Sequence, residues 1–145
     1  LLFDHIIFNT DRNPGNLLVK FCKNDVSLKV IDHTHVFINQ ALWDASCLKR
    51  AMEENDLLDT KVLEYNSYLY GMFFHNFSVT KEMLEKESLT FKSRINRDII
   101  IGIIDIIPEE WKPKQKDIDE LVNYILYRVD NLDVIISTIL IYNNR

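Results

Sequence analysis

The stretch that decides the fold is Phe8-Asn9-Thr10-Asp11-Arg12-Asn13-Pro14-Gly15-Asn16, and a second short stretch, Val30-Ile31-Asp32-His33, follows it along the chain. In Asn13-Pro14-Gly15, proline fixes φ and glycine accepts a left-handed corner, which predicts a tight type II turn. Asn16 is therefore expected to leave this turn in a defined direction.

A β-hairpin is predicted directly after the turn. Two apolar or β-branched runs, 17–22 and 27–31, are separated by a short polar segment that contains Asn24. Asn24 lies midway between Asn16 and Asp32. A turn centred there would place these two side chains opposite each other, with their Cβ atoms about 5 Å apart.

That pairing suggests a metal site beside an acid. The amide oxygen of Asn16 and the carboxylate of Asp32 are hard oxygen ligands of the kind that Mg²⁺ takes, together with water and substrate phosphate. Asp11 would remain free to orient or deprotonate a hydroxyl group, which is the division of roles that phosphoryl transfer needs. A structural turn aspartate is the alternative for Asp11, but the placement of Asn16 and Asp32 favours the catalytic role.

The same residues carry a resemblance to kinase-like folds. Asp11-Arg12, Asn16 and the later Asp32-His33 resemble the catalytic and metal-binding segments of HipA-like kinases and phosphoinositide lipid kinases. The run 3–12 is most similar to a HipA-related family of bacterial and phage proteins, and 107–111 carries a weaker similarity. The resemblance implies that Asp11 is the catalytic aspartate, that Asn16 and Asp32 bind the metal, and that Mg²⁺ and ATP are the cofactors.

The chain departs from the family pattern at three points. Asn13 stands where these kinases usually have histidine, and His33-Thr34 replaces the Phe-Gly pair of protein kinases. No glycine-rich phosphate loop or nucleotide-pairing lysine precedes the catalytic turn in this chain. We therefore expect residues 1–145 to form a single kinase-like C-lobe, a fragment that binds ATP weakly or not at all and is inactive without an N-lobe.

Composition narrows the class of protein. The 145 residues are 47% hydrophobic and 27% charged, which is ordinary for one globular domain, and the three glycines and three prolines favour helix. The net charge of −5 argues against nucleic-acid binding, which needs a basic face. The longest apolar run, 134–142, is too short to span a bilayer. Two cysteines in apolar patterns and no signal peptide indicate the cytoplasm.

Helices are predicted over most of the remaining chain, which makes the fold class mainly α with a small β-hairpin. The chain is expected to open in the last turns of a helix, and Asn39 to cap a helix with its apolar face between Ala41 and Met52. The aromatic-rich segment 57–77 is predicted to be helical. Its aromatic side chains from Tyr65 to Phe77 could form a binding platform, but a role as core or as a packing surface for a missing N-lobe is favoured. The stretch 80–107 suits one long or two abutting helices, with 95–107 buried nearly all round.

Two further helices are predicted near the end of the chain. Asp117 and Glu120 resemble a capping box, and a regular apolar stripe runs from there to Val129. A second helix is expected after Asp130-Asn131. Together, the early hairpin and the later helices resemble the organisation of a kinase C-lobe.

Several roles stay open at the sequence level. Arg12 is expected to make a structural ion pair or to hold the catalytic turn. His33 and His35 could share a strand face, but zinc needs about four ligands, so one buried and one exposed histidine is favoured. The expected partners are a nucleotide, the missing N-lobe segment and an acceptor that is a protein, a small molecule or a lipid head group. The alternative function is a non-catalytic interaction or regulatory module.

Overall fold

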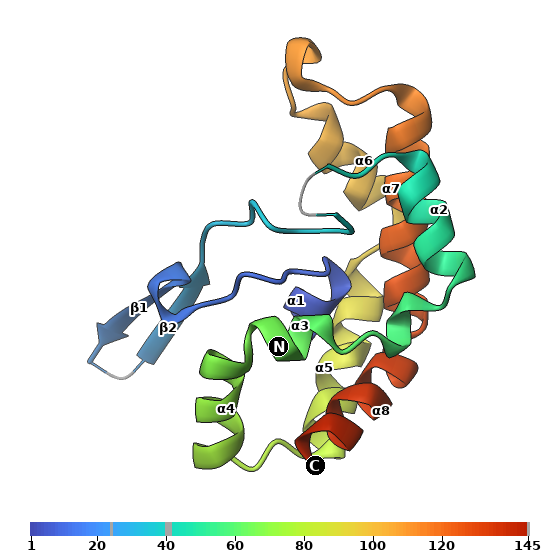
Figure 1. Ribbon diagram of the computed structural model, residues 1–145. Helices are drawn as coiled ribbons and strands as arrows, with labels where there is room; N and C mark the ends of the chain where they lie inside the picture. Colours follow the sequence, from blue (N-terminus) through green and yellow to red (C-terminus); the bar gives the residue numbers. More distant parts are fainter. Residues whose placement is uncertain (24, 40–41, 145) are drawn as a thin grey trace.

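The computed structural model describes residues 1–23, 25–39 and 42–144, and these are mainly helical with one two-stranded sheet (Figure 1). The predicted fold class is confirmed. The elements, in chain order, are α1 (Leu2–Ile6), η1 (Pro14–Asn16), β1 (Leu17–Cys22), β2 (Asp25–Val30), α2 (Ala45–Glu53), η2 (Asp56–Leu58), α3 (Lys61–Tyr65), α4 (Ser67–Asn76), α5 (Lys81–Arg94), α6 (Arg97–Asp105), η3 (Glu109–Trp111), α7 (Gln115–Asp130) and α8 (Leu132–Asn143).

The hairpin of β1 and β2 projects from the helical body (Figure 1). Its antiparallel register runs from Leu17 opposite Val30 to Cys22 opposite Asp25. The Ile31 amide donates to the Asn16 carbonyl at 3.0 Å and so continues that register. The prediction that Asn16 faces Asp32 is therefore wrong by one residue, and a slip of one residue reverses the face to which a side chain points.

The expected turn centre, Asn24, lies outside the described residues. The predicted type II turn is also wrong, because Pro14, Gly15 and Asn16 form a 3₁₀ turn in which the Asn16 amide donates to the Asn13 carbonyl at 3.0 Å. No glycine among the described residues has a positive φ. Proline at the first position suits this geometry, which needs no left-handed residue.

Helix α7 organises the helical body. It packs against α1, α2, α5, α6 and α8 (Figure 1). On one side, its Val122 and Tyr124 are fully buried in a core shared with α2 and α6. Near its end, Val129 lies in a second core with α1, α4, α5 and α8. The predicted second helix after Asn131 is confirmed as α8.

A buried arginine joins α7 to the start of the chain. The Arg128 Nη1 atom lies 2.7 Å from Asp56 Oδ2, and Arg128 Nε donates to the His5 carbonyl at 2.8 Å. The guanidinium also stacks over the Phe8 ring at 5.1 Å, and the Tyr124 hydroxyl donates to Asp56. These contacts fix α1, η2 and α7 together in the interior.

Two expected helix caps are corrected by the structure. Asp44, not Asn39, caps α2 by accepting from the Cys47 amide at 2.8 Å, and Asn39 has a left-handed φ of 65°. Ala41, expected on that helix, lies outside the described residues. Asp117 does not form a capping box, because its carboxylate accepts from the Ala45 amide at 2.9 Å and so holds the start of α2 against α7.

The segments 57–77 and 80–107 are helical as predicted, and the second resolves into two abutting helices, α5 and α6. The expectation that 95–107 is buried all round is wrong. Ile100 and Ile104 are buried against α7, but Ile99, Ile103 and Ile106 are 51%, 62% and 82% exposed. Within the described ranges, no helix is long and apolar enough to cross a membrane.

The fold contains a buried neutral histidine on α1. His5 is almost fully buried, its Nδ1 donates to the Leu1 carbonyl at 3.0 Å, and its Nε2 has no partner among the described residues. Burial, the largest cause, lowers the pKa of His5 from 6.5 to about 3. The folded protein therefore keeps this imidazole neutral under conditions in which an unfolded chain protonates it.

Acid should destabilise the fold through His5. Below pH 6.5 the His5 imidazole is protonated in the unfolded chain, whereas in the folded chain it stays neutral until about pH 3. The free energy of unfolding therefore falls as the pH drops through that window. Urea unfolding should show a loss of about 2 kcal/mol between pH ~7 and pH ~5. The His5→Asn variant keeps a donor near Nδ1 and should lack this slope, and an unchanged slope would contradict the assignment.

Candidate functional site

The turn that carries Asp11 is built on a buried ion pair between Arg12 and Asp4. Arg12 Nε and Nη2 donate to Asp4 Oδ1 at 3.0 and 2.9 Å, and both side chains are almost fully buried. Arg12 Nη1 donates to the carbonyls of Ile31 and Asn16 at 2.9 and 3.4 Å. The expectation of a structural ion pair at Arg12 is confirmed, and the arginine joins α1, the turn and the exit of the hairpin.

Asp4 is the acceptor at the centre of this network. The Tyr70 hydroxyl on α4 donates to Asp4 Oδ2 at 2.7 Å, and Asn9 Nδ2 donates to Asp4 Oδ1 at 3.1 Å. Burial alone would raise the pKa of Asp4, but the hydrogen bonds from Arg12 and Tyr70 hold it below its ordinary value. Asp4 therefore stays ionised beside Arg12, and burial together with Asp4 raises the pKa of Tyr70.

Two asparagines close the turn from the helical side. Asn66 accepts from the Arg12 amide at 2.6 Å and donates to the Asn9 carbonyl at 2.8 Å. Asn9 in turn accepts from the Asp11 amide at 3.0 Å. Because the backbone on both sides of Asp11 is bonded to buried side chains, the position of its Cα is fixed by the protein interior.

A chain of polar side-chain contacts joins Asp11 to Asp32. Asp11 Oδ2 lies 3.4 Å from His35 Nδ1, and the Thr34 hydroxyl lies 3.1 Å from the same nitrogen. Thr34 Oγ1 donates to Asp32 Oδ1 at 2.8 Å. The side chains of Asp11 and His35 are 45% and 44% exposed, and Asp32 is exposed. The two acids thus belong to one solvent-accessible polar cluster.

The backbone holds this cluster in a strained conformation. The Thr10 amide donates to the His35 carbonyl at 3.1 Å, and the Phe37 amide donates to the Ile7 carbonyl at 2.7 Å, so the segment after β2 lies against the turn. Phe8, Asp32 and Phe37 have left-handed φ values of 49°, 55° and 61°. Left-handed backbone is costly for a bulky side chain, and such strain gathers at functional sites.

Asn16 contacts the backbone of Asp11. It is buried, and its Nδ2 donates to the Asp11 carbonyl at 3.0 Å. In the part of the chain that the structure describes, no hydrogen bond occupies its Oδ1. Asn16 is therefore bonded to the Asp11 backbone, and the hairpin sets it opposite Ile31 rather than opposite Asp32, as the sequence had suggested.

The donor set can be compared with what Mg²⁺ requires. Hydrogen bonds from the Thr34 hydroxyl and amide lower the pKa of the exposed Asp32 carboxyl, so it is an anion near neutral pH. Among residues 1–23, 25–39 and 42–144, no three His, Cys, Asp or Glu side chains form a group that could hold a cation. A carboxylate and an amide oxygen are ligands of the type that Mg²⁺ takes together with water and phosphate oxygens, and the register places Asn16 opposite Ile31 rather than opposite Asp32.

The two histidines differ from the expectation of one buried and one exposed ring, since both are half-buried. His35 belongs to the polar cluster. The His33 ring packs edge-on against Phe3 with centroids 5.7 Å apart, and its Nε2 has no hydrogen-bond partner among the described residues.

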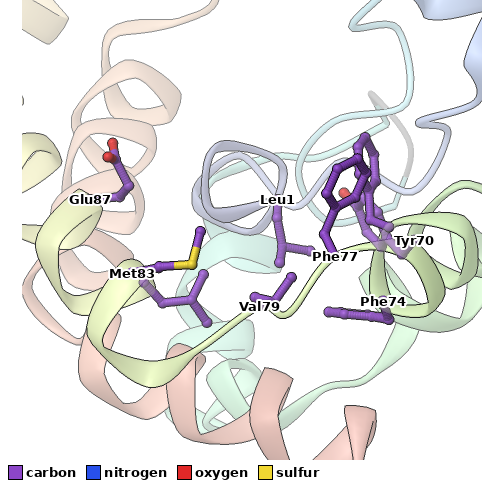
Figure 2. A pocket seen from close by; sticks show the side chains of 9 residues that line it. Leu1, Tyr70, Phe74, Phe77, Val79, Met83 and Glu87 are labelled. Carbon is purple, nitrogen blue, oxygen red and sulfur yellow. The ribbon is translucent and has the colours of Figure 1, made fainter.

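The aromatic segment contributes to a cavity away from these acids. Phe73, Phe74 and Phe77, together with Tyr70, line an apolar cavity of about 380 Å³ between α4 and α5. Figure 2 shows Glu87 at one end of it, apart from the aromatic rings at the other. Its described lining residues are almost entirely apolar, so they offer no acid–base pair for chemistry.

No protein-family model, curated protein or solved structure matches this chain. The functional argument therefore depends on the geometry of the site.

Sequence reasoning missed three residues of the site: Asp4, Asn66 and Tyr70. The available signal for Asp4 was an acid inside a short apolar helix, which is costly unless it is paired. Asn66 and Tyr70 lie more than fifty residues away along the chain, and nothing local to them indicates the contact.

Removing Asp4 should cost far more stability than removing an exposed acid. The Asp4→Ala change leaves the Arg12 guanidinium buried without its counter-ion, and breaking such a pair costs about 3–5 kcal/mol. The matched control is Glu85→Ala, which breaks the exposed Lys81–Glu85 pair and should cost no more than about 0.5 kcal/mol. Chemical denaturation of both variants measures the difference, and equal losses would refute the central role of Asp4.

Proposed function

We propose that this chain is the catalytic lobe of an ATP-dependent phosphotransferase of HipA-like type. The observation that supports the proposal most is the solvent-accessible linkage of Asp11 to Asp32 through His35 and Thr34, held on a buried frame by Arg12. Two carboxylates and an amide oxygen are the types of group that phosphoryl transfer uses.

In this proposal, Asp11 acts on the phosphate acceptor. Its carboxylate accepts the proton of an acceptor hydroxyl while the hydroxyl oxygen bonds to the γ-phosphorus of ATP. The bond between that phosphorus and the β–γ bridging oxygen breaks, and ADP leaves. Because hydrogen bonds on both sides of Asp11 fix its backbone, the base is positioned before the acceptor arrives.

Asp32 and Asn16 would hold Mg²⁺, which when bound neutralises charge on the β- and γ-phosphates. Asp32 offers a carboxylate oriented by the Thr34 hydroxyl at 2.8 Å. Asn16 donates its Nδ2 to the Asp11 carbonyl at 3.0 Å, which leaves its amide oxygen for the ion. Asn13 Nδ2 lies 3.4 Å from Asp11 Oδ1, so the residue that departs from the kinase pattern still contacts the proposed base.

The hairpin supports the expectation of a second lobe. Paired residues share a face of the sheet, so one face consists entirely of apolar side chains. Most of them are 37–79% exposed, which is a large apolar surface for a protein to leave in water. This face comprises Leu17, Val19, Phe21, Val26, Leu28 and Val30. We assign it to an N-lobe that covers the nucleotide, in a cytoplasmic protein that uses ATP.

The same apolar face favours the second candidate, a non-catalytic interaction or regulatory module. In that case another protein covers the hairpin, and Asp11 and Asp32 do not catalyse a reaction.

Substitution of the two acids tests the proposed function in the intact protein. Asp32→Ala should abolish ATP-dependent phosphoryl transfer, because the carboxylate for the metal is gone. Asp11→Asn should lower the rate roughly 10²–10⁴-fold while nucleotide affinity stays near that of wild type. The matched control is Asp25→Asn, an exposed acid at the start of β2, which should leave the rate unchanged.

Thermal melts of all three variants control for folding. If Asp11→Asn and Asp32→Ala melt like wild type and keep its activity, the kinase proposal fails. If wild type consumes no ATP with any acceptor tried and shows no nucleotide-dependent shift in melting temperature, the interaction module replaces it.

A further inference from the structure

A second cavity, of about 390 Å³, lies beside the turn that carries Asp11. Its walls come from four parts of the chain that the fold brings together: the catalytic turn, the segment after β2, α2 and α3. Polar and apolar groups share the lining, unlike the apolar cavity between α4 and α5. The residues that define it are Thr10, Phe37, Asn39, Arg50, Lys61 and Tyr65.

The charge of this cavity is opposite to that of the whole chain. Arg50 and Lys61 line it, and no carboxylate is among its described lining residues, although the chain has a net charge of −5. Lys61 Nζ donates to Asp59 Oδ2 at 2.9 Å, which offsets part of its charge. No ion pair among the described residues engages Arg50, so its guanidinium is the cation available to a ligand.

The cavity shares a wall with the polar cluster. Thr10 lines it directly before Asp11 in the chain, and the Thr10 amide donates to the carbonyl of His35 at 3.1 Å. The His35 ring is the group that contacts Asp11 at 3.4 Å. A molecule seated in this cavity therefore lies against the same pair of segments that positions the proposed base.

We propose that this cavity is the acceptor site and that it takes a hydroxyl-bearing molecule with an anionic group. Arg50, with help from Lys61, holds the anionic group, because a guanidinium binds two oxygens of a carboxylate or a phosphate at once. The apolar part of the acceptor packs against Phe37. The volume is within the range of small-molecule sites. The role of the ligand as phosphate acceptor rests on the proposed phosphotransferase function, whereas the binding of an anion at Arg50 does not depend on that function.

Anion binding is measured on the intact protein by backbone amide chemical shifts during titration with inorganic phosphate and, separately, with malonate, at constant ionic strength. Saturable shifts are expected at Thr10, Cys47 and Lys61. The stronger of the two titrations identifies phosphate or carboxylate as the preferred anionic group. Arg50→Gln should weaken binding at least about tenfold, as loss of a charged hydrogen bond implies, and Arg50→Lys should restore part of it.

The matched control is Lys49→Gln, which removes a neighbouring exposed cation of α2 that does not line the cavity, and it should bind like wild type. Absence of saturable shifts with both anions, or equal weakening by Arg50→Gln and Lys49→Gln, overturns the site. Displacement of phosphate by ATP from these same residues would assign the cavity to the nucleotide and overturn its role as acceptor site.

The Asp11→Asn variant separates this inference from the proposed function. It should bind phosphate like wild type, because Asp11 does not line the cavity. Arg50-dependent phosphate binding with wild-type activity in Asp11→Asn leaves the anion site standing and removes the kinase proposal. Loss of activity in Asp11→Asn without any anion binding at Arg50 leaves the kinase proposal and removes the acceptor site.

Discussion

The ion pair between Arg12 and Asp4 is the interaction on which the rest of the structure depends. Taking a guanidinium and a carboxylate out of water costs several kcal/mol for each ion, and only good geometry with further hydrogen bonds offsets that cost. Arg12 meets this condition because its planar donors reach Asp4 and the carbonyls of Asn16 and Ile31 together. The start of the chain, the turn and the hairpin exit cannot separate without leaving a buried charge unpaired.

Helix α1 shows how much this arrangement supports. At five residues it is too short to be stable alone. Two buried guanidiniums hold neighbouring groups on it: Arg12 binds the Asp4 carboxylate, and Arg128 binds the His5 carbonyl. Since Arg128 belongs to α7, α1 connects the polar turn to the hydrophobic cores, and Asn66 and Tyr70 add direct bonds from the helical body.

Local patterns in the sequence predicted the elements well and their pairings less well. The hairpin, the two abutting helices α5 and α6 and the break between α7 and α8 follow from turn residues and apolar spacing near each position. The start of α2 did not, because its first amides donate to Asp44 and to Asp117, which is distant in sequence, whereas Asn39 bonds to the Leu42 carbonyl before the helix begins. The register of the hairpin differs by one residue from the symmetric expectation, since turn composition alone did not fix it.

The residues of the candidate site also divide into those that the local sequence predicts and those that it does not. Asp11, Asn16 and Asp32 are visible in the sequence because an acid-arginine pair, an amide and a later acid follow a recognisable spacing. Their frame is not visible, because Asn66 and Tyr70 reach the turn across more than fifty residues. Such contacts depend on how helices pack, which a local pattern does not encode. The exposed hairpin face was likewise hidden, since alternation predicts which residues share a face but not what covers it.

The distribution of strain and burial argues that the turn does more than hold the chain together. Its supporting groups, Asp4 and Arg12, are buried and fully bonded, whereas the acids that they position, Asp11 and Asp32, face solvent. Phe37 adopts left-handed backbone, which glycine would adopt at lower cost, while its ring packs against Trp43 and Tyr124. The buried frame maintains an exposed and negatively charged surface beside a cation-lined cavity. Separation of opposite charges at one accessible place is what a site needs in order to bring a metal-bound phosphate and an anionic acceptor together.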